Sequence, residues 1–266
     1  MPRTMALDPL FTAVDSAAFT DRHLANLAAG TLAAVRVPGF LDSAACRAAV
    51  AASGRLPTAD YDPARVPTPI VRFGPALNDY LGQDGDLDAD RYWADAEAAR
   101  ATWHRAGMRP DPVAVSLARL GSAWGAAVTP ATIGGRAVFG GTLREINSGA
   151  PIHYDDVNRE APQLFDQEVV AQLAFNVWVA VPPTGGQTTV WRHRWEPVDE
   201  RHRRSYGYRP ETVQHCQHVS LTPALGDGLL FNPGNVHAVR PNPGGRRIAF
   251  AYFLGLTTTG RLIAWS

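Results

Sequence analysis

The sequence lacks an excess of charge of either sign. Its 25 basic residues (lysine plus arginine) are balanced by 25 acidic ones, and the formal net charge is +0 with histidine neutral. Such a chain has no overall field that would draw it to nucleic acid or to an anionic membrane surface, so we expect neither as a partner. Cysteine is also scarce: Cys46 and Cys216 stand far apart and form no CxxC pair. This excludes a disulfide scaffold and favours a reducing compartment.

Long hydrophobic runs are missing as well. No stretch approaches the roughly 18 uninterrupted apolar residues that a membrane helix needs, and residues 1–16 lack the apolar centre of a signal peptide. We therefore expect a soluble, cytoplasmic protein. A sizeable core is still available, because 45% of the 266 residues are hydrophobic. Without internal repeats or low-complexity linkers, this length fits one domain over residues 1–266.

The first half of the chain favours helices. Asp42 or Ser43 can cap the alanine-rich stretch that follows, which predicts a helix there. Residues 88–107 have apolar side chains near helical spacing and end on a glycine, and residues 112–124 are a third candidate. A short strand and turn are predicted at 35–40.

From about residue 134 the pattern changes to short apolar runs separated by turn residues. This spacing is typical of an antiparallel barrel or sandwich and not of a parallel α/β sheet. The predicted fold class is therefore mainly β with N-terminal helices, in which a helical part at 1–130 packs on a β core at 131–266. The runs are RAVFGGTLREIN, VVAQLAFNVWVAV, QTTVW, CQHVSLTP, DGLLFNP, HAVRP, RRIAFAYFLGL and RLIAWS.

A candidate metal site begins in the segment INSGAPIHYDDVN, where His153 and Asp155 stand two positions apart. Side chains at i and i+2 of a strand share a face, so this imidazole and carboxylate can converge on one ion. The pair alone is common by chance, and the third ligand must come from elsewhere; His237 in FNPGNVHAVRP is the candidate. Two histidines and a carboxylate leave three octahedral positions open, as in non-haem iron(II) oxygenases. Glu145 and Asn147, just upstream of His153, could orient a ligand histidine without binding the metal themselves.

Two adjacent arginines follow His237 in GGRRIAFAYFLG. Strand alternation places Arg246 and Arg247 on opposite faces. The face of Arg247 carries alanines that leave room for a cosubstrate, so we choose Arg247. A guanidinium directed into an apolar barrel needs an anionic partner, which a dicarboxylate would supply through a bidentate contact. The alternative is that both arginines lie at the surface.

The order of these motifs resembles that of the Fe(II)- and 2-oxoglutarate-dependent dioxygenases: HxD, a strand ending in a GG turn, GDxLxF, a histidine and then GRR. The resemblance covers about residues 136–256, and VPGFLDSAAC looks like the entry segment of such enzymes. It implies a double-stranded β-helix (jelly-roll, cupin-like) core. It also implies Fe(II) on His153, Asp155 and His237, 2-oxoglutarate as a cosubstrate held by Arg247, and dioxygen as the oxidant.

Within this superfamily the chain looks most like the carrier-free hydroxylases of N-substituted amino acids and the related indole-alkaloid halogenases. The halogenases replace the carboxylate ligand with glycine, whereas this chain keeps Asp155. The resemblance therefore implies hydroxylation of an unactivated C–H bond, with desaturation or cyclisation as alternatives, and Asp155→Gly is expected to open a halide position. The expected substrate is a small metabolite, an amino-acid derivative or a natural-product intermediate. A homodimer is compatible with the sequence.

Other polar residues are candidates for the pocket. Asn176 could hydrogen-bond a cosubstrate carboxylate or a water, and Thr188 or Trp191 could contact cosubstrate or substrate. The alternatives are an amide on the solvent face for Asn176 and a core aromatic for Trp191. Arg72 and Arg144 are candidate ligands for a substrate carboxylate, with plain surface arginines as the alternative.

Rival interpretations remain open at this point. His215, Cys216 and His218 form an HCxH pattern, but strand alternation would separate the two histidines, and no partner cluster with zinc-like spacing follows. The arginines at 192–209 are predicted to form a solvated segment. A cupin-like metal enzyme that needs no 2-oxoglutarate would place no demand on Arg247. A non-catalytic binding barrel would not need three convergent ligands.

Overall fold

The computed structural model describes residues 11–63, 66–82 and 85–266. Most of the N-terminal stretch that argues against a signal peptide, residues 1–10, lies outside this description. None of the helices in the described ranges is long and apolar enough to cross a bilayer. The α-helices are α1 (Asp21–Ala28), α2 (Ser43–Ser53), α3 (Ala89–Ala106), α4 (Pro112–Trp124) and α5 (Val157–Glu160), and the 3-10 helices are η1 (Leu77–Tyr80), η2 (Pro197–His202) and η3 (Pro210–Thr212).

The three helices predicted from the sequence are confirmed, and local signals set their ends. The side chain of Asp42 accepts a hydrogen bond from the amide of Ala45 and so caps α2. Helix α3 stops at Gly107, whose φ of 61° is in the left-handed region that glycine tolerates. Asp111 caps α4 in the same way as Asp42 caps α2.

Most of the remaining regular structure is β-strand, arranged in two sheets of ten and six strands within the described residues. Both are largely antiparallel. The larger sheet runs in the order β1 (Ala13–Asp15), β2 (Ala34–Val37), β15 (Gly228–Phe231), β10 (Val169–Ala180), β17 (Ile248–Thr257), β8 (Thr142–Glu145), β4 (Val71–Phe73) and β3 (Ala59–Asp60), with β18 (Leu262–Trp265) on β17 and β5 (Thr129–Pro130) on β18. The smaller sheet runs in the order β12 (Arg203–Arg204), β13 (Gly207–Tyr208), β9 (Ala150–His153), β16 (Asn235–Val239), β11 (Thr188–Arg194) and β14 (His218–Leu221), and β6 (Thr132–Ile133) and β7 (Arg136–Ala137) form a separate pair.

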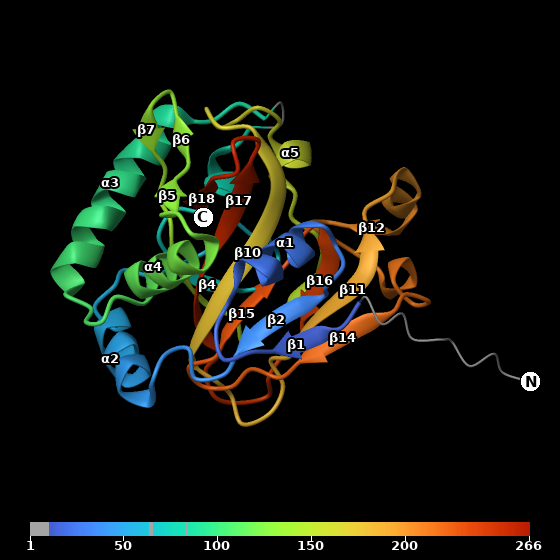
Figure 1. Ribbon diagram of the computed structural model, residues 1–266, viewed down its shortest axis with the longest axis horizontal. Coiled ribbons are helices and arrows are strands. Elements are labelled where there is room, and N and C mark those ends of the chain that lie inside the picture. Colours follow the sequence, from blue (N-terminus) through green and yellow to red (C-terminus); the bar gives the residue numbers. More distant parts are fainter. Residues whose placement is uncertain (1–10, 64–65, 83–84) are drawn as a thin grey trace, which may run out of the picture.

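Strand alternation divides the core into two parts. Phe175 and Val177 on β10, with Phe250 on β17, belong to a large cluster that includes residues of α1 to α4. Trp178 and Ala249, on the opposite face of the same strands, pack in a second cluster against residues of β11 and β14. Figure 1 shows α2, α3 and α4 on one side of β10 and β17, and β11 and β14 on the other. The larger sheet is therefore covered by helices on one face and faces the smaller sheet with the other.

The N-terminal half is not only a helical layer, as the sequence had suggested. Strand β2 lies beside β15 in the larger sheet, with Val35 opposite Leu230. At the other edge β4 pairs with β8, where Arg72 is opposite Arg144. The short strand predicted at 35–40 is confirmed at its start by β2, whereas β4 was not predicted because its three residues are too few for an alternation to be recognised; long-range pairing stabilises both. The fold is thus a mixed one, mostly strand, in which both halves of the chain build the same sheet.

Candidate metal centre and active site

A cavity of about 460 Å³ lies between the two sheets. Its volume falls in the range of small-molecule sites, about 300–1,000 Å³. Strands β10 and β17 line it from the larger sheet through Asn176 and Ala251, and β9 and β16 line it from the smaller sheet through His153 and His237. The sequence candidates Asp155, Thr188, Arg144 and Arg247 also line it.

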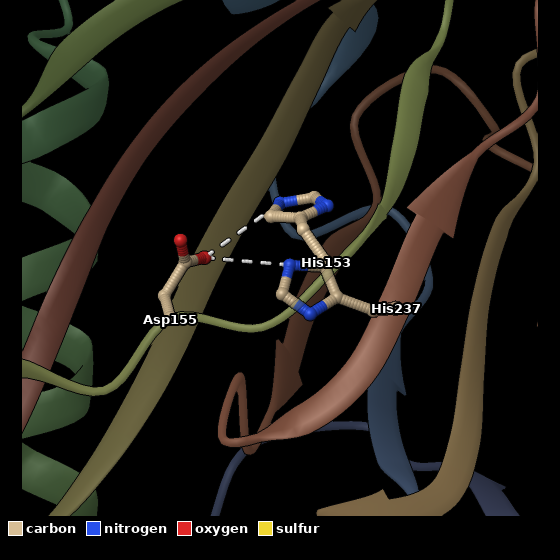
Figure 2. Close-up of side chains that lie close together, drawn as sticks. All are labelled: His153, Asp155 and His237. Carbon is tan, nitrogen blue, oxygen red and sulfur yellow. Dashed lines mark ion pairs between the residues drawn. The ribbon is translucent and has the colours of Figure 1, made fainter. Parts of the chain in front are cut away.

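The three predicted metal ligands converge in this cavity. His153 on β9 and His237 on β16 are direct partners across the antiparallel ladder. Asp155 follows β9, and its Oδ2 lies 3.9 Å from His153 Nε2 and 3.4 Å from His237 Nε2 (Figure 2). Metal–ligand distances near 2.1 Å place ligand atoms at right angles about 3 Å apart, so these separations suit three ligands of one ion. In the described part of the chain this is the one group of three such side chains close enough to share an ion.

The orientation of both imidazoles is set by the backbone. His153 Nδ1 lies 2.7 Å from the carbonyl oxygen of Pro151, and His237 Nδ1 lies 3.0 Å from that of Asn235. A carbonyl can only accept, so each Nδ1 carries the proton and each Nε2 presents its lone pair to the centre. Two Nε2 lone pairs and a carboxylate that face one another are suited to hold a cation between them.

Burial and neighbouring groups together lower the pKa values of both His153 and Asp155. It lowers the pKa of His153 to about 4, aided by the neighbouring His237, so this imidazole is neutral near pH 7. Burial by itself would raise the pKa of Asp155, but its interactions with His237 and His153 bring the pKa down to about 2. The site therefore offers an ionised carboxylate and two imidazoles whose Nε2 atoms face it, the ligand set of non-haem iron(II) sites with open positions.

A close approach of two strands allows this geometry. Gly149, just before β9, has a φ of 81°, and a Cβ atom there would lie 2.6 Å from the carbonyl oxygen of Val239 on β16. Any other residue would push β9 away from β16. The glycine therefore keeps His153 close to His237.

Arg247 is the second charged feature of the cavity. Only 2% of it is exposed; its Nε donates to the carbonyl oxygen of Gly186 at 2.9 Å, and an Nη donates to Thr188 Oγ1 at 3.1 Å. No carboxylate forms an ion pair with it in the described ranges. Burial lowers the pKa of Arg247 to about 10, so the group is still charged at neutral pH. A buried cation without a protein anion is a site for an anionic ligand.

Arg246 lies on the other side of the strand. Its side chain is 57% exposed and forms two contacts with Glu145, at 2.9 and 2.6 Å. Glu145 also accepts from Asn147, whose side-chain oxygen in turn accepts from the amide of Arg247. The expectation that Glu145 and Asn147 orient a ligand histidine is wrong, because backbone carbonyls occupy both Nδ1 atoms. These two side chains instead fix the start of β17.

Strand alternation decides which of the other predicted cosubstrate contacts, Thr188, Asn176 and Trp191, point into the cavity. Thr188 and Asn176 both line the cavity. Trp191 does not: it stands three residues after Thr188, so it points to the opposite face of β11 and packs against His218 at 6.0 Å between ring centroids. The structure therefore does not support Trp191 as a cosubstrate contact.

The two arginines proposed for the substrate also differ. Arg144 lines the cavity; its Nε is buried without a hydrogen-bond partner, and no described carboxylate forms an ion pair with it. Arg72 forms an ion pair with Asp79, donates to the carbonyl of Gly74 and does not line the cavity. Arg72 is thus neutralised within the protein, and Arg144 is left as the cation available to a substrate.

The arginines of the segment 192–209 are all exposed, as predicted for a solvated segment, but the segment is regularly folded. Residues 192–209 include η2 and the β12–β13 hairpin, and Tyr208 is 6% exposed. Tyr206, near the tip of this hairpin, lines the cavity and packs on His153 with 4.9 Å between ring centroids. The serine–tyrosine–glycine turn between two very short strands was the sequence signal for this hairpin.

Among described residues, His215, Cys216 and His218 form no metal-binding group.

Sequence comparison identifies one relative that matches almost throughout. No protein-family model matches the chain. The chain is 55% identical over 258 residues to L-gamma-glutamyl-L-propargylglycine hydroxylase of Streptantibioticus cattleyicolor, which covers 96% of each protein. Identity at this level over almost the whole length of both chains shows common membership of one family.

Solved structures show where else this fold occurs. An N-substituted L-amino acid dioxygenase from Burkholderia ambifaria AMMD superposes with a TM-score of 0.64 over 93% of this chain and 92% of that one, at 17% identity. The same enzyme in complex with alpha-KG superposes with a TM-score of 0.63 over 91% and 90% of the two chains, again at 17% identity. At this identity the likeness is one of fold.

Proposed function

Since this chain belongs to the Fe(II)- and 2-oxoglutarate-dependent dioxygenases and is a non-haem iron hydroxylase, we propose that its substrate is an amino acid acylated on nitrogen by a γ-glutamyl group. The observation that carries the proposal is Arg144, which lines the cavity and whose buried Nε has no hydrogen-bond partner among the described residues. It is supported by the relative at 55% identity, which is named for a γ-glutamyl amino acid. Acylation leaves the carboxylate of the amino acid free, and a guanidinium is suited to bind it.

The architecture supports a finer description of the fold. We infer that the two sheets form a double-stranded β-helix and that the chain folds as one domain. The cavity lies between the sheets and takes residues from both, as the metal and the cosubstrate require. Helices α1 to α4 share one core with the outer face of the larger sheet.

The donor set fits iron(II). His153 and His237 present Nε2 lone pairs, and Asp155 presents an ionised oxygen, all within 4.8 Å of one another. When bound, iron with 2-oxoglutarate and dioxygen supplies the oxidation that converts a substrate C–H bond to C–OH, while 2-oxoglutarate becomes succinate and carbon dioxide. The protein fixes the ligands beforehand through the two backbone carbonyls, so little reorganisation is needed.

In this proposal the cosubstrate and the substrate are bound by different cationic side chains of the cavity. Arg247 binds the distal carboxylate of 2-oxoglutarate, and Thr188 holds the guanidinium in position. Asn176 also lines the cavity and can donate a hydrogen bond to a carboxylate oxygen. Arg144 binds the substrate carboxylate, and Tyr206 covers His153 and excludes water from the metal side of the cavity.

Two experiments test this function. Iron(II) and 2-oxoglutarate, added without dioxygen, are expected to give the weak visible band of the chelate. With dioxygen, a set of γ-glutamyl amino acids that includes γ-glutamyl-propargylglycine is expected to yield a product with one added oxygen atom and an equivalent of succinate. Free amino acids are expected to give little product. Hydroxylation of free amino acids, with no reaction of any γ-glutamyl compound, would overturn the proposal.

A variant pair links the substrate to Arg144. Arg144→Gln is expected to raise the KM for the γ-glutamyl substrate by about 10- to 100-fold, the effect of one charged hydrogen-bonded contact, without changing the visible band. The control is Arg261→Gln, at an exposed arginine that does not line the cavity. Equal effects of the two substitutions would exclude Arg144 as a substrate ligand.

A further inference from the structure

The cavity contains one acidic side chain that the mechanism does not use. Within the described residues, three acidic side chains line it: Asp79, Asp155 and Glu160. Asp79 forms an ion pair with Arg72, and Asp155 faces the two histidines. Glu160 has no ion-pair partner in the described part of the chain.

Glu160 is held in place although its charge is not compensated. It is the last residue of α5, and its two carboxylate oxygens accept hydrogen bonds from Asn78 Nδ2 at 3.0 Å and from the amide of Asp156 at 3.5 Å. The adjacent Arg159 is directed elsewhere: its Nε donates to the Tyr154 hydroxyl, and its guanidinium stacks on Trp195 at 3.0 Å from the ring centroid. The neighbouring cation therefore does not reach the Glu160 carboxylate.

The surroundings of Glu160 disfavour a negative charge in the absence of a ligand. The side chain of Glu160 is exposed and lines the cavity. Partial desolvation, with the negative charges of Asp155 and Asp156, raises the pKa of Glu160. A cationic group of a ligand would stabilise the ionised carboxylate of Glu160 by compensating its negative charge.

We propose that Glu160 binds the ammonium group of the substrate and, with Arg144, makes the cavity select γ-glutamyl amino acids over acyl amino acids that lack an amino group. The inference rests on the proposed function. In a γ-glutamyl amino acid the nitrogen of the modified residue is an uncharged amide, so the one ammonium group is that of the glutamyl part. An N-succinyl or N-glutaryl amino acid has carboxylates for Arg144 but no cation for Glu160.

The test compares two substrates and two enzymes. The substrates are a γ-glutamyl amino acid and its N-glutaryl counterpart, which has hydrogen in place of the ammonium group. Wild type is expected to prefer the γ-glutamyl compound by about 10- to 100-fold in kcat/KM, mainly through KM. Glu160→Gln keeps an acceptor for Asn78 and is expected to remove most of this preference while leaving the N-glutaryl compound within about threefold of wild type. The matched control is Glu168→Gln, at an exposed glutamate outside the cavity.

A binding measurement separates recognition from folding. Both substrates are titrated without dioxygen into protein loaded with iron(II) and 2-oxoglutarate, and the change in the visible band is followed. Unchanged intensity of the starting band in Glu160→Gln shows that the site is intact. Weaker binding of the γ-glutamyl compound alone supports the assignment. Equal weakening of both compounds, or equal binding of both by wild type, overturns it. Failure of wild type to hydroxylate either compound overturns the proposed function and, with it, this inference.

Discussion

Arg246 and Arg247 are neighbours in the chain, yet one guanidinium is exposed and paired while the other is buried and has no anion beside it among the described residues. The exposed guanidinium of Arg246 forms an ion pair with Glu145. The buried guanidinium of Arg247 donates hydrogen bonds to Gly186 and Thr188 inside the cavity. The difference follows from the alternation of side chains in the segment that leads into β17. Substitutions at the two positions can therefore be compared to test the role of the buried guanidinium.

Substitution of Arg247 is expected to impair cosubstrate binding selectively. Arg247→Gln removes the charge and the bidentate geometry, so the KM for 2-oxoglutarate is expected to rise by about 100-fold or more. Arg246→Gln is expected to change this KM by less than about threefold, since exposed ion pairs contribute up to about 1 kcal/mol. Initial rates at varied 2-oxoglutarate check both. Equal KM values for the two variants would remove Arg247 from the cosubstrate site.

The Arg246–Glu145 pair is expected to contribute to stability in a pH-dependent way. The hydrogen bond from Arg246 lowers the pKa of Glu145 below its usual 4.5, so the native state binds fewer protons than the unfolded state as the pH falls through this range. The stabilisation is therefore fully present above pH 4.5 and is lost as the pH drops through the lowered pKa.

Arg246→Gln should thus lower the free energy of unfolding by up to about 1 kcal/mol at pH 7 and by progressively less under acid conditions. Urea unfolding of both proteins at several pH values measures the difference. A difference between the proteins that stayed constant from pH 7 to well below pH 4.5 would contradict the assigned ion pair.

Removal of a metal ligand is expected to abolish the iron chelate. His237→Ala leaves His153 and Asp155 without the third ligand, so the visible band with iron(II) and 2-oxoglutarate should disappear and hydroxylation should fall below detection. His218→Ala, at an exposed histidine of β14, is the control and should keep both. Persistence of the band in His237→Ala would refute the ligand assignment.

The sequence was informative where strand alternation or a fixed spacing determines geometry. His153 and Asp155 at i and i+2, and the choice of Arg247 over Arg246, depend on local regularity, and the structure places all three side chains in the cavity. The family expected from the motif order is confirmed by the relative at 55% identity. The same alternation could have separated Trp191 from Thr188, because residues three apart in a strand face opposite ways.

Other parts of the site were inaccessible because tertiary contacts decide them. Arg72 is neutralised by Asp79, which comes from η1 and has no recognisable relation to it in the sequence. Glu160 reaches the cavity through a four-residue helix, which is too short to show a period. Tyr206 is carried by two-residue strands that fold over His153. For Glu160 and Tyr206 the direction of the side chain depends on packing between distant segments, and for Arg72 it depends on how the chain folds back over seven residues.

Tyr206 is expected to keep oxidation coupled to substrate hydroxylation. It follows Ser205, whose φ of 53° makes the tight turn of the β12–β13 hairpin, and its ring packs on the imidazole of His153. Tyr206→Ala opens this side of the cavity to water, so the ratio of succinate to hydroxylated product should rise, measured by quantifying both in the same reaction. Tyr206→Phe keeps the ring and is expected to retain the wild-type ratio. An unchanged ratio in the alanine variant, or a phenylalanine variant as uncoupled as alanine, would show that ring packing does not protect the site.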